Sequence, residues 1–298
     1  MTASIHRRRL LIAAATWLPL SQLQAASNIM KPPRHVSANA QFTQIEAMSG
    51  GRLGVAVLDT GSGKSWGYRE AERFPFCSTF KLLLAAAVLA RVDAGVEKLM
   101  RPLPYSEVDL LEYAPITRAH VADGSMMVGE LCAAAIQYSD NTAANLLLTS
   151  IGGPGALTAW LRAQGDNVTR LDRTGPTLNT AIKGDERDTT TPEAMLASTQ
   201  KLVLGNVLSN PSRQQLQDWL MGNTTGDARL RAGLPKDWRV GDKTGTGENG
   251  ASNDVAVIWP KGRAPLVVVS FLSETSAKTE VRNATHVEVA RAIVAAVG

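Results

Sequence analysis

The chain has 298 residues and a net charge of +4, with 44% hydrophobic and 19% charged residues. This length is enough to bury a large core in one or two domains, and the composition is that of an ordinary globular protein. The Lys and Arg residues are scattered, and their excess begins in the first segment. The charge pattern therefore excludes a nucleic-acid-binding function.

Residues 1–26 have the pattern of a secretory signal peptide. A basic group at 6–9 precedes an apolar run at 10–20 and a small-residue segment that ends near Ala25 or Ala26. The apolar run is shorter than the ~20 residues that span a bilayer. The paired arginines also fit a twin-arginine export signal, and a membrane anchor or an unstructured tail is the alternative. We expect a periplasmic or secreted mature protein with no stable membrane association.

The chain has two cysteines, Cys77 and Cys132. A single bridge could join them, but cysteines are often buried without bonding, so we expect two free, buried thiols. The histidines cluster neither with cysteines nor with one another; they are His6, His35, His120 and His286. This scatter argues against a zinc site, and we expect neither a metal nor a cofactor.

The first elements after the leader are a helix and a hairpin. Residues 41–48 complete a helix that Gly50 and Gly51 stop. The β-branched residues of 52–59 predict a strand, and the glycine-rich turn 60–64 leads into a second strand at 65–68. The tight turn accounts for these glycines, so a phosphate-binding role is not needed to explain them.

Residues 80–220 have a nearly all-helical pattern, with Pro and Gly marking the loops. Two of the helices are expected at 130–137 and 142–150. Strands return at 254–259 and 264–272, and 279–297 has the pattern of an amphipathic helix.

This order predicts an α+β fold, in which an antiparallel sheet built from both termini is flanked by helices and carries an inserted all-helical lobe. We assign 27–70 and 222–298 to the sheet lobe and 71–221 to the helical lobe. A cleft between two lobes is a natural place for a small-molecule site, so we expect the active site there.

Candidate chemistry begins at Ser78 and Lys81, where an Ala- and Leu-rich helical run opens. Three residues apart, they lie on one face of a helix, and the helix dipole favours an ionised serine. Serine is a weak nucleophile until a base takes its proton, and a lysine with a lowered pKa can be that base. The alternative is a helix cap beside a solvated lysine. The same spacing recurs at Ser198 and Lys201, where we infer no chemistry.

Two further motifs follow in order: Ser-Asp-Asn at 139–141 and Lys-Thr-Gly at 243–245. Taken alone, the first could be a helix cap and the second a solvated strand end. Together with Ser-x-x-Lys they form the signature of class A β-lactamases and penicillin-binding proteins. The chain resembles an exported class A serine β-lactamase from Gly51 to the final helix. Residues 174–182 are most similar to the branch that hydrolyses cefotaxime.

The resemblance implies a role for each motif residue. Ser78 attacks the lactam carbonyl and becomes acylated, while Lys81, its pKa lowered by nearby Lys243, takes the proton. Ser139 passes a proton to the leaving nitrogen. The oxyanion binds the backbone N–H groups of Ser78 and Thr246. The substrate-binding residues of these motifs are Asn141, Lys243, Thr244, Gly245 and Thr246.

Five other positions also match the family. Arg229 lies where one branch places the arginine that supports the carboxylate grip, and Ser252 occupies the position that other branches use. Tyr113 matches an aromatic at the cleft mouth, Glu248 a rim position, and Asn179 a substrate-side asparagine. The alternatives are a surface arginine at 229 and a packing tyrosine at 113.

Residue 175 departs from the family pattern. The family has a glutamate directly before a proline, with an asparagine three residues after it. Here Pro176 and Asn179 are present, but the glutamate position is Gly175. That glutamate is the accepted base for deacylation, although its part in acylation is disputed. Glycine cannot take a proton from water, and general-base assistance contributes about 10²–10⁴-fold, so the acyl-enzyme should persist.

Other residues bear on this expectation. Glycine loosens the loop, although an ion pair between Arg173 and Asp188 would still tie its ends. Lys81, Asp185 and Glu186 are weak candidates for a substitute base, since the last two would require a refolded loop.

Three functions compete. The first is a β-lactam hydrolase with an acyl-enzyme on Ser78. The second is a non-hydrolytic trap or sensor that stops at the acyl-enzyme, which Gly175 favours. The third is a D-Ala-D-Ala peptidase with the same motifs, against which the loop remnant 173–179 argues. We expect a small-molecule β-lactam as the partner and, by resemblance, a monomer.

Overall fold

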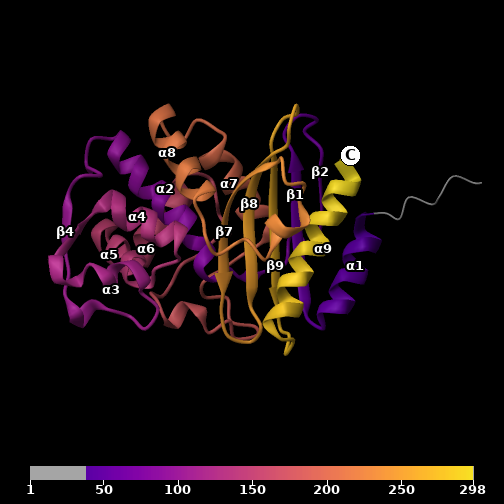
Figure 1. Cartoon of the computed structure of the whole chain (residues 1–298), viewed down its shortest axis with the longest axis horizontal. Coiled ribbons are helices and arrows are strands. Elements are labelled where there is room, and N and C mark those ends of the chain that lie inside the picture. Colours follow the sequence, from indigo (N-terminus) through magenta and orange to yellow (C-terminus); the bar gives the residue numbers. More distant parts are fainter. Residues whose placement is uncertain (1–37, 298) are drawn as a thin grey trace, which may run out of the picture. The chain divides into compact units, whose positions relative to one another are not determined.

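The structure is a computed structural model that describes residues 38–297 (Figure 1). The predicted signal peptide at 1–26 lies outside these residues. The strands are β1 (Arg52–Asp59), β2 (Ser65–Tyr68), β3 (Phe74–Pro75), β4 (Pro102–Pro104), β5 (Ser125–Met127), β6 (Thr189–Thr190), β7 (Arg239–Thr246), β8 (Ser252–Trp259) and β9 (Leu266–Ser273).

The α-helices are α1 (Ala38–Ser49), α2 (Phe80–Asp93), α3 (Pro115–Ala119), α4 (Val128–Gln137), α5 (Asn141–Ile151), α6 (Pro154–Ala163), α7 (Pro192–Val203), α8 (Asn210–Met221) and α9 (Thr279–Val297). The short 3₁₀ helices are η1 (Cys77–Thr79), η2 (Glu107–Asp109), η3 (Val121–Asp123), η4 (Thr177–Asn179) and η5 (Leu230–Gly233).

The central sheet has five antiparallel strands in the order β2-β1-β9-β8-β7. Strands from the two ends of the chain meet where β1 pairs with β9, with Arg52 opposite Ser273. The predicted α+β fold, with its sheet built from both termini, is confirmed. The stretch predicted as nearly all helix also contains the short pair β4–β5, where Pro102 and Pro104 cannot continue a helix.

Alternate residues of the strands face two separate cores, as the two-residue period of a strand requires. Val55 and Val57 of β1 pack with Phe42 of α1 in one core, which α9 also lines. Ala56 and Leu58 pack into the other core, which the remaining helices line. Figure 1 shows α1 and α9 side by side on one face of the sheet, with the other helices on the opposite side.

Helix α2 runs through the second core. Every residue from Phe80 to Leu89 is buried. Apart from Lys81, this stretch is apolar on all sides, which is the pattern of a helix buried in a core, and each buried Leu contributes about 1.5–3 kcal/mol. The pattern predicted that this helix opens at Ser78, but the α-helix starts at Phe80 and Ser78 lies in the 3₁₀ turn η1. The buried helix therefore anchors the turn that carries Ser78.

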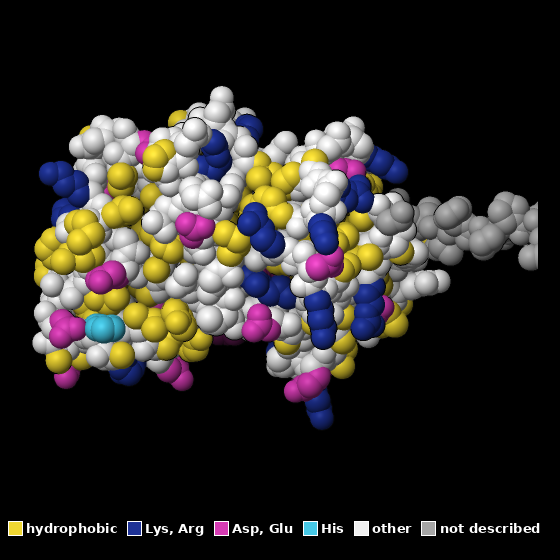
Figure 2. Space-filling model, turned by 45° about the horizontal axis from the view of Figure 1, so that its top comes forward, with side chains coloured by type: hydrophobic (Ala, Val, Ile, Leu, Met, Phe, Trp, Pro, Cys, Tyr) yellow, Lys and Arg dark blue, Asp and Glu magenta, His cyan; other side chains and the backbone are white. Residues whose placement is uncertain are grey.

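The described part of the chain contains no helix that is both long and apolar enough to cross a bilayer. Figure 2 shows basic and acidic side chains interspersed over one face of the molecule.

Candidate active site

Turn η1, which carries Ser78, lies directly against strand β7. Gly245 permits this approach, because a Cβ there would lie 2.7 Å from the carbonyl oxygen of Phe76 and 3.2 Å from the Cβ of Cys77. Cys77 has a φ of +48°, a left-handed conformation that L residues rarely adopt. Ser78 is thus placed between α2 and β7 with only 7% of its surface exposed.

A cavity of about 400 Å³ opens beside Ser78, a size suited to a small-molecule ligand. Tyr113, 52% exposed, is at its rim. The residues that line the cavity are Ser78, Tyr113, Ser139, Asn141, Asn179, Thr225, Arg229, Thr244 and Thr246. All except Thr225 were singled out from the sequence. The hydroxyl of Thr225 bonds to that of Thr244.

Lys81 and Lys243 are both buried, and both reach the hydroxyl of Ser139. The Nζ atom of Lys81 lies 3.3 Å, and that of Lys243 3.2 Å, from Ser139 Oγ. Burial lowers the pKa of Lys81 well below its usual range, and the charge of Lys243 lowers it further. Burial also lowers the pKa of Lys243 to about 7. The solvated-lysine alternative is wrong for both positions.

A neutral Lys81 amine has two N–H bonds and one lone pair. Its two shortest contacts are with the carbonyl oxygen of Ser139 and with Asn141 Oδ1, both at 2.7 Å. Because these acceptors take both protons, the lone pair is left to accept a proton. That is the state that a general base needs. The hydrogen-bond partners of Lys81 are Ser139 and Asn141, while Ser78 lines the cavity beside them.

The Ser-Asp-Asn motif combines a helix start with two cavity residues. Asp140 is the N-cap of α5, where its carboxylate accepts the N–H of Ala143 at 2.9 Å and that of Thr117 at 2.9 Å. The capping alternative therefore holds for Asp140. Ser139, with a φ of +57°, and Asn141 line the cavity on either side of it.

Arg229 is 8% exposed, so the surface-arginine alternative is wrong. Its Nη1 donates to the carbonyl oxygens of Gly245 at 2.9 Å and Asn253 at 2.6 Å, and its Nη2 donates to Thr246 Oγ1 at 2.7 Å. Its Nε donates to Oδ1 of Asn283 at 3.2 Å, a residue that the sequence did not indicate. Burial lowers the pKa of this guanidinium. Arg229 thus places a fixed positive charge at the end of β7.

Ser252, the alternative arginine position, is part of a buried network instead. Its hydroxyl lies 3.1 Å from Nε2 of His286, and the Nδ1 of that ring lies 2.8 Å from Ser270 Oγ. Burial, together with the charge of Arg229, lowers the pKa of His286 well below its usual range. A neutral imidazole therefore joins α9 to strands β8 and β9.

Gly175 is held in place by the side chain of Asn145, which the sequence did not indicate. Asn145 Oδ1 accepts the N–H of Gly175 at 3.0 Å, and Asn145 Nδ2 donates to its carbonyl at 3.0 Å. A Cβ at residue 175 would lie 3.5 Å from Leu111 and 3.8 Å from the Cβ of Asn141, which is ordinary contact. Neither space nor backbone conformation requires glycine here.

The loop around Gly175 is also tied at its ends. Arg173 Nε lies 2.5 Å from Asp188 Oδ2, so the ion pair named from the sequence is present. Asp188 Oδ1 also accepts the N–H groups of Asp172 and Arg173 at 2.8 and 2.9 Å. The expected loosening by glycine is therefore opposed by bonds at three points of the loop.

The two carboxylates proposed as weak substitutes for a glutamate do not line the cavity beside Ser78. Asp185 and Glu186 instead line a separate cavity with Arg52 and Ser273. The Arg187 guanidinium lowers the pKa of Asp185 to about 2, so that carboxylate is a poor proton acceptor. Lys81 is the remaining candidate of the three.

Asn179 and Glu248 meet at the edge of the cavity. The backbone N–H of Glu248 donates to the carbonyl oxygen of Asn179 at 2.8 Å, and the Glu248 side chain is exposed. The buried Oδ1 of Asn179 has no hydrogen-bond partner among the described residues.

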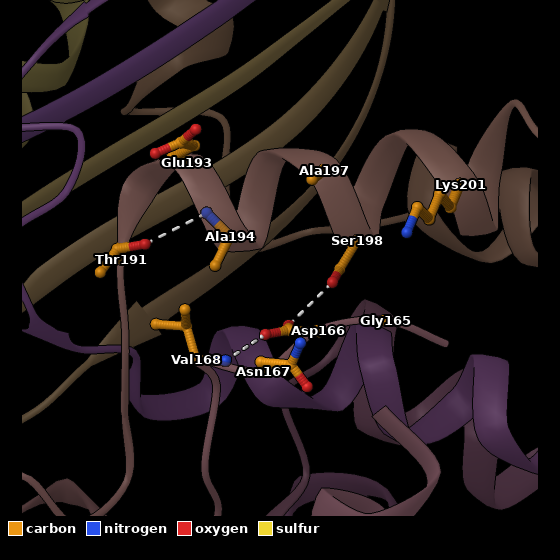
Figure 3. Close-up of a pocket in the computed structure, with 10 residues that line it drawn as sticks. All are labelled: Gly165, Asp166, Asn167, Val168, Thr191, Glu193, Ala194, Ala197, Ser198 and Lys201. Atoms are coloured by element: carbon orange, nitrogen blue, oxygen red, sulfur yellow. Dashed lines mark hydrogen bonds between the residues drawn. The ribbon is translucent and has the colours of Figure 1, made fainter. Parts of the chain in front are cut away.

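A second cavity, of about 340 Å³, lies between α7 and the segment 165–168 (Figure 3). Asp166 accepts the hydroxyl of Ser198 at 2.8 Å and the N–H of Val168 at 3.0 Å, and Thr191 caps α7 through Ala194. These bonds join the segment to the helix. None of the lining side chains carries a buried polar atom without a partner in the described structure.

Cys77 and Cys132 are both free and buried, and burial raises the pKa of the Cys77 thiol to about 12. Within residues 38–297, no group of three or more His, Cys, Asp or Glu side chains could hold a metal ion.

The site can be compared with known proteins. Residues 37–297 match the model of the "Beta-lactamase enzyme family". The chain is 51% identical to β-lactamase CTX-M-8 of Citrobacter amalonaticus over 84% of this chain and 87% of that one. It is 49% identical to the carbapenem-hydrolyzing β-lactamase KPC of Klebsiella oxytoca over 90% and 89%. A solved class A β-lactamase, the last common ancestor of Gram-negative bacteria, is similar with a TM-score of 0.87 and 63% identity, covering 88% of this chain and 100% of that one.

Proposed function

The chain belongs to the β-lactamase enzyme family as a class A serine β-lactamase, which hydrolyses the β-lactam amide, and from this premise we propose that its slow step is release of the acyl group from Ser78. The observation that carries the proposal is Gly175, which puts no carboxylate beside the cavity where the family has one.

Acylation uses groups that the cavity holds. Ser78 Oγ attacks the lactam carbonyl while the neutral amine of Lys81 takes its proton. Ser139 passes a proton to the departing lactam nitrogen, since its hydroxyl lies within 3.3 Å of both buried lysines. No step of this half-reaction requires a residue at position 175.

Binding of the substrate uses the end of β7. The N–H groups of Ser78 and Thr246 hold the oxyanion, where fixed dipoles stabilise the charge that develops in the transition state. The substrate carboxylate binds at Lys243, Thr244, Gly245 and Thr246, supported by the buried charge of Arg229. Asn141 and Asn179 contact the rest of the substrate, with Tyr113 and Glu248 at the rim.

Deacylation has no comparable group. Water must lose a proton as it attacks, and loss of a general base costs about 10²–10⁴-fold. Asp185 and Glu186 lie at another cavity, and Lys81 is the only one of the three candidate bases near the site. The acyl-enzyme should therefore accumulate during turnover.

Intact-protein mass spectrometry tests this directly. Purified protein is mixed with excess benzylpenicillin and sampled over time. An adduct of the full penicillin mass on Ser78 that persists for hours supports the proposal. Rapid return to free protein with consumption of the drug would contradict it. If neither an adduct nor consumption of the drug is observed, D-alanyl peptides become the favoured substrates.

The absence of a carboxylate at residue 175 also favours a second candidate function, that of a β-lactam trap or sensor. If the adduct outlasts the biological lifetime of the protein, the chain binds β-lactams covalently and releases almost none. The two functions differ only in the deacylation rate constant, which the time course measures.

Three further proposals concern the setting of the enzyme. We propose that residues 1–26 direct export to the periplasm or the medium, and that the mature protein is monomeric and not membrane-bound. We also propose that 27–70 with 222–298 and 71–221 act as two lobes with the active site in the cleft between them. Cell fractionation tests export, and size-exclusion chromatography of the mature protein tests the monomer.

A further inference from the structure

A chain of hydrogen bonds runs from the buried Asp242 to the end of β7 beside the cavity. Asn223 Nδ2 donates to Asp242 Oδ2 at 2.6 Å, and Arg231 Nε pairs with the other oxygen of that carboxylate. The backbone N–H of Thr225 donates to Asn223 Oδ1 at 3.1 Å. Both contacts identify Oδ1 as the acceptor end of the amide, so the orientation of Asn223 is fixed.

This orientation sets the direction of the next two hydrogen bonds. The Thr225 hydroxyl lies 2.9 Å from Asn223 Oδ1, which can only accept, so Thr225 donates its single hydroxyl proton there. In the bond between the hydroxyls of Thr225 and Thr244, the proton must therefore come from Thr244. Thr244 lines the cavity beside Ser78. Because its own proton is turned away, its hydroxyl offers the cavity only lone pairs.

Thr246 has the opposite character. Its Oγ1 accepts a hydrogen bond from Arg229 Nη2 at 2.7 Å, since a guanidinium can only donate. Among the described residues no acceptor takes the Thr246 proton, which is left for the cavity that Thr246 also lines. Alternate residues of a strand share a face, so Thr244 and Thr246 lie on the same face of β7. The cavity therefore has a hydroxyl acceptor and a hydroxyl donor next to each other.

A primary carboxamide matches this pair. Its nitrogen donates and its oxygen accepts, and one carbon atom holds both. A carboxylate has the same shape but two acceptors, so one of them meets the lone pairs of Thr244 unless two hydroxyls turn round. Thr225 then donates to Thr244 instead of to Asn223, and one internal hydrogen bond is lost. The fixed charge of Arg229 offsets this loss for a carboxylate, whereas a carboxamide requires no turn.

We propose that the protein is also acylated by β-lactams that have a neutral primary carboxamide in place of the carboxylate, and that Thr225 determines this substrate range by turning the Thr244 hydroxyl away from the cavity. The inference rests on the proposed function, because the reaction at the lactam is the same. Ser78 Oγ forms a bond to the lactam carbonyl carbon, the bond from that carbon to nitrogen breaks, and the serine proton ends on the nitrogen. Nothing is oxidised or reduced.

Three forms of benzylpenicillin test the proposal: the parent carboxylate, the primary carboxamide and the methyl ketone. The ketone has as many non-hydrogen atoms as the carboxamide but no donor. The second-order rate constant of acylation is measured for each from the growth of the adduct on Ser78 by intact mass. Release of the acyl group does not affect this constant. Where the adduct clears quickly, consumption of the drug at low concentration gives the same constant as kcat/KM.

The carboxamide should acylate the protein about tenfold faster than the methyl ketone, because only the carboxamide donates to Thr244. Thr225→Val keeps the shape of the side chain but has no hydroxyl, so it frees the Thr244 proton for a carboxylate. The ratio of the carboxamide rate constant to the carboxylate rate constant should then fall about fivefold. Thr225→Ser retains the hydroxyl, is the matched control, and should keep the ratio of the unaltered chain. A general loss of structure would lower both rate constants without changing their ratio.

The two proposals fail in different ways. A carboxamide that reacts no faster than the methyl ketone overturns the carboxamide site, whatever the lifetime of the adduct. A ratio that is the same in Thr225→Val and in the unaltered chain overturns the role of Thr225. An adduct that clears rapidly overturns the slow deacylation but leaves the comparison of acylation rate constants valid.

Discussion

Asn145 clamps the backbone of Gly175 from both sides, accepting its N–H and donating to its carbonyl at 3.0 Å each. Both bonds go to the main chain, so they do not depend on the side chain at residue 175. A Cβ at this position would meet only ordinary van der Waals contacts, the nearest at 3.5 Å.

Gly175→Glu should therefore raise the deacylation rate constant by about 10²–10⁴-fold, the usual contribution of a general base. The clamp fixes the backbone, and the new Cβ would have no neighbour closer than 3.5 Å. The measurement is the lifetime of the benzylpenicillin adduct, with steady-state turnover alongside it.

Gly175→Gln is the matched control for this variant, since it has the same size but no proton acceptor. It should leave the adduct as long-lived as in the unaltered chain. Equal acceleration by Glu and Gln would show that loop order, and not proton transfer, limits deacylation.

Ser139→Ala should slow acylation by about 10²–10³-fold. Its hydroxyl is the one group within hydrogen-bonding distance of both Lys81 and Lys243 in the described structure, and it supplies the proton to the leaving nitrogen. The second-order rate constant of adduct formation with benzylpenicillin measures the effect. A change of less than about threefold would remove Ser139 from the proton path.

Local patterns predicted the regular elements well. Strand 52–59, strand 65–68 and helix 279–297 have the expected bounds, because their periodicity and flanking glycines are local features. The start of α2 was placed two residues early, because the left-handed Cys77 produces a 3₁₀ turn that no apolar pattern records.

The supporting residues of the site could not be predicted in this way. Asn145 bonds a residue thirty positions away, and Asn283 bonds Arg229 across fifty-four. Such amide contacts have no periodicity. One signal was available: Asn145 follows Asn141 by four positions, so both lie on one face of α5. The burial of Lys243 could not be predicted from the sequence either, because lysine side chains are mostly exposed in proteins.

The second-order rate constant of acylation should fall as the pH rises above about 7. This constant reports the free enzyme, in which Lys243 has a pKa of about 7. Below that pH the ammonium attracts the substrate carboxylate, and above it the charge is lost. Lys243→Arg should abolish the decline, because a guanidinium stays protonated. A profile that is flat from pH 6 to about 9 in the unaltered chain would contradict this assignment.

Asp188→Asn should destabilise the fold by about 2–3 kcal/mol. Asp188 is fully buried and binds Arg173 Nε at 2.5 Å, and breaking a buried pair costs about 3–5 kcal/mol. We expect about 2–3 kcal/mol, below this range, because the Arg173 side chain is 18% exposed and water can solvate its charge once the ion pair is lost. Urea denaturation should show a lower midpoint at an unchanged slope. Asp237→Asn, at an exposed site, is the control and should shift stability by less than about 0.5 kcal/mol. An equally small effect at residue 188 would mean that the Asn145 clamp and the backbone bonds hold the loop without the ion pair.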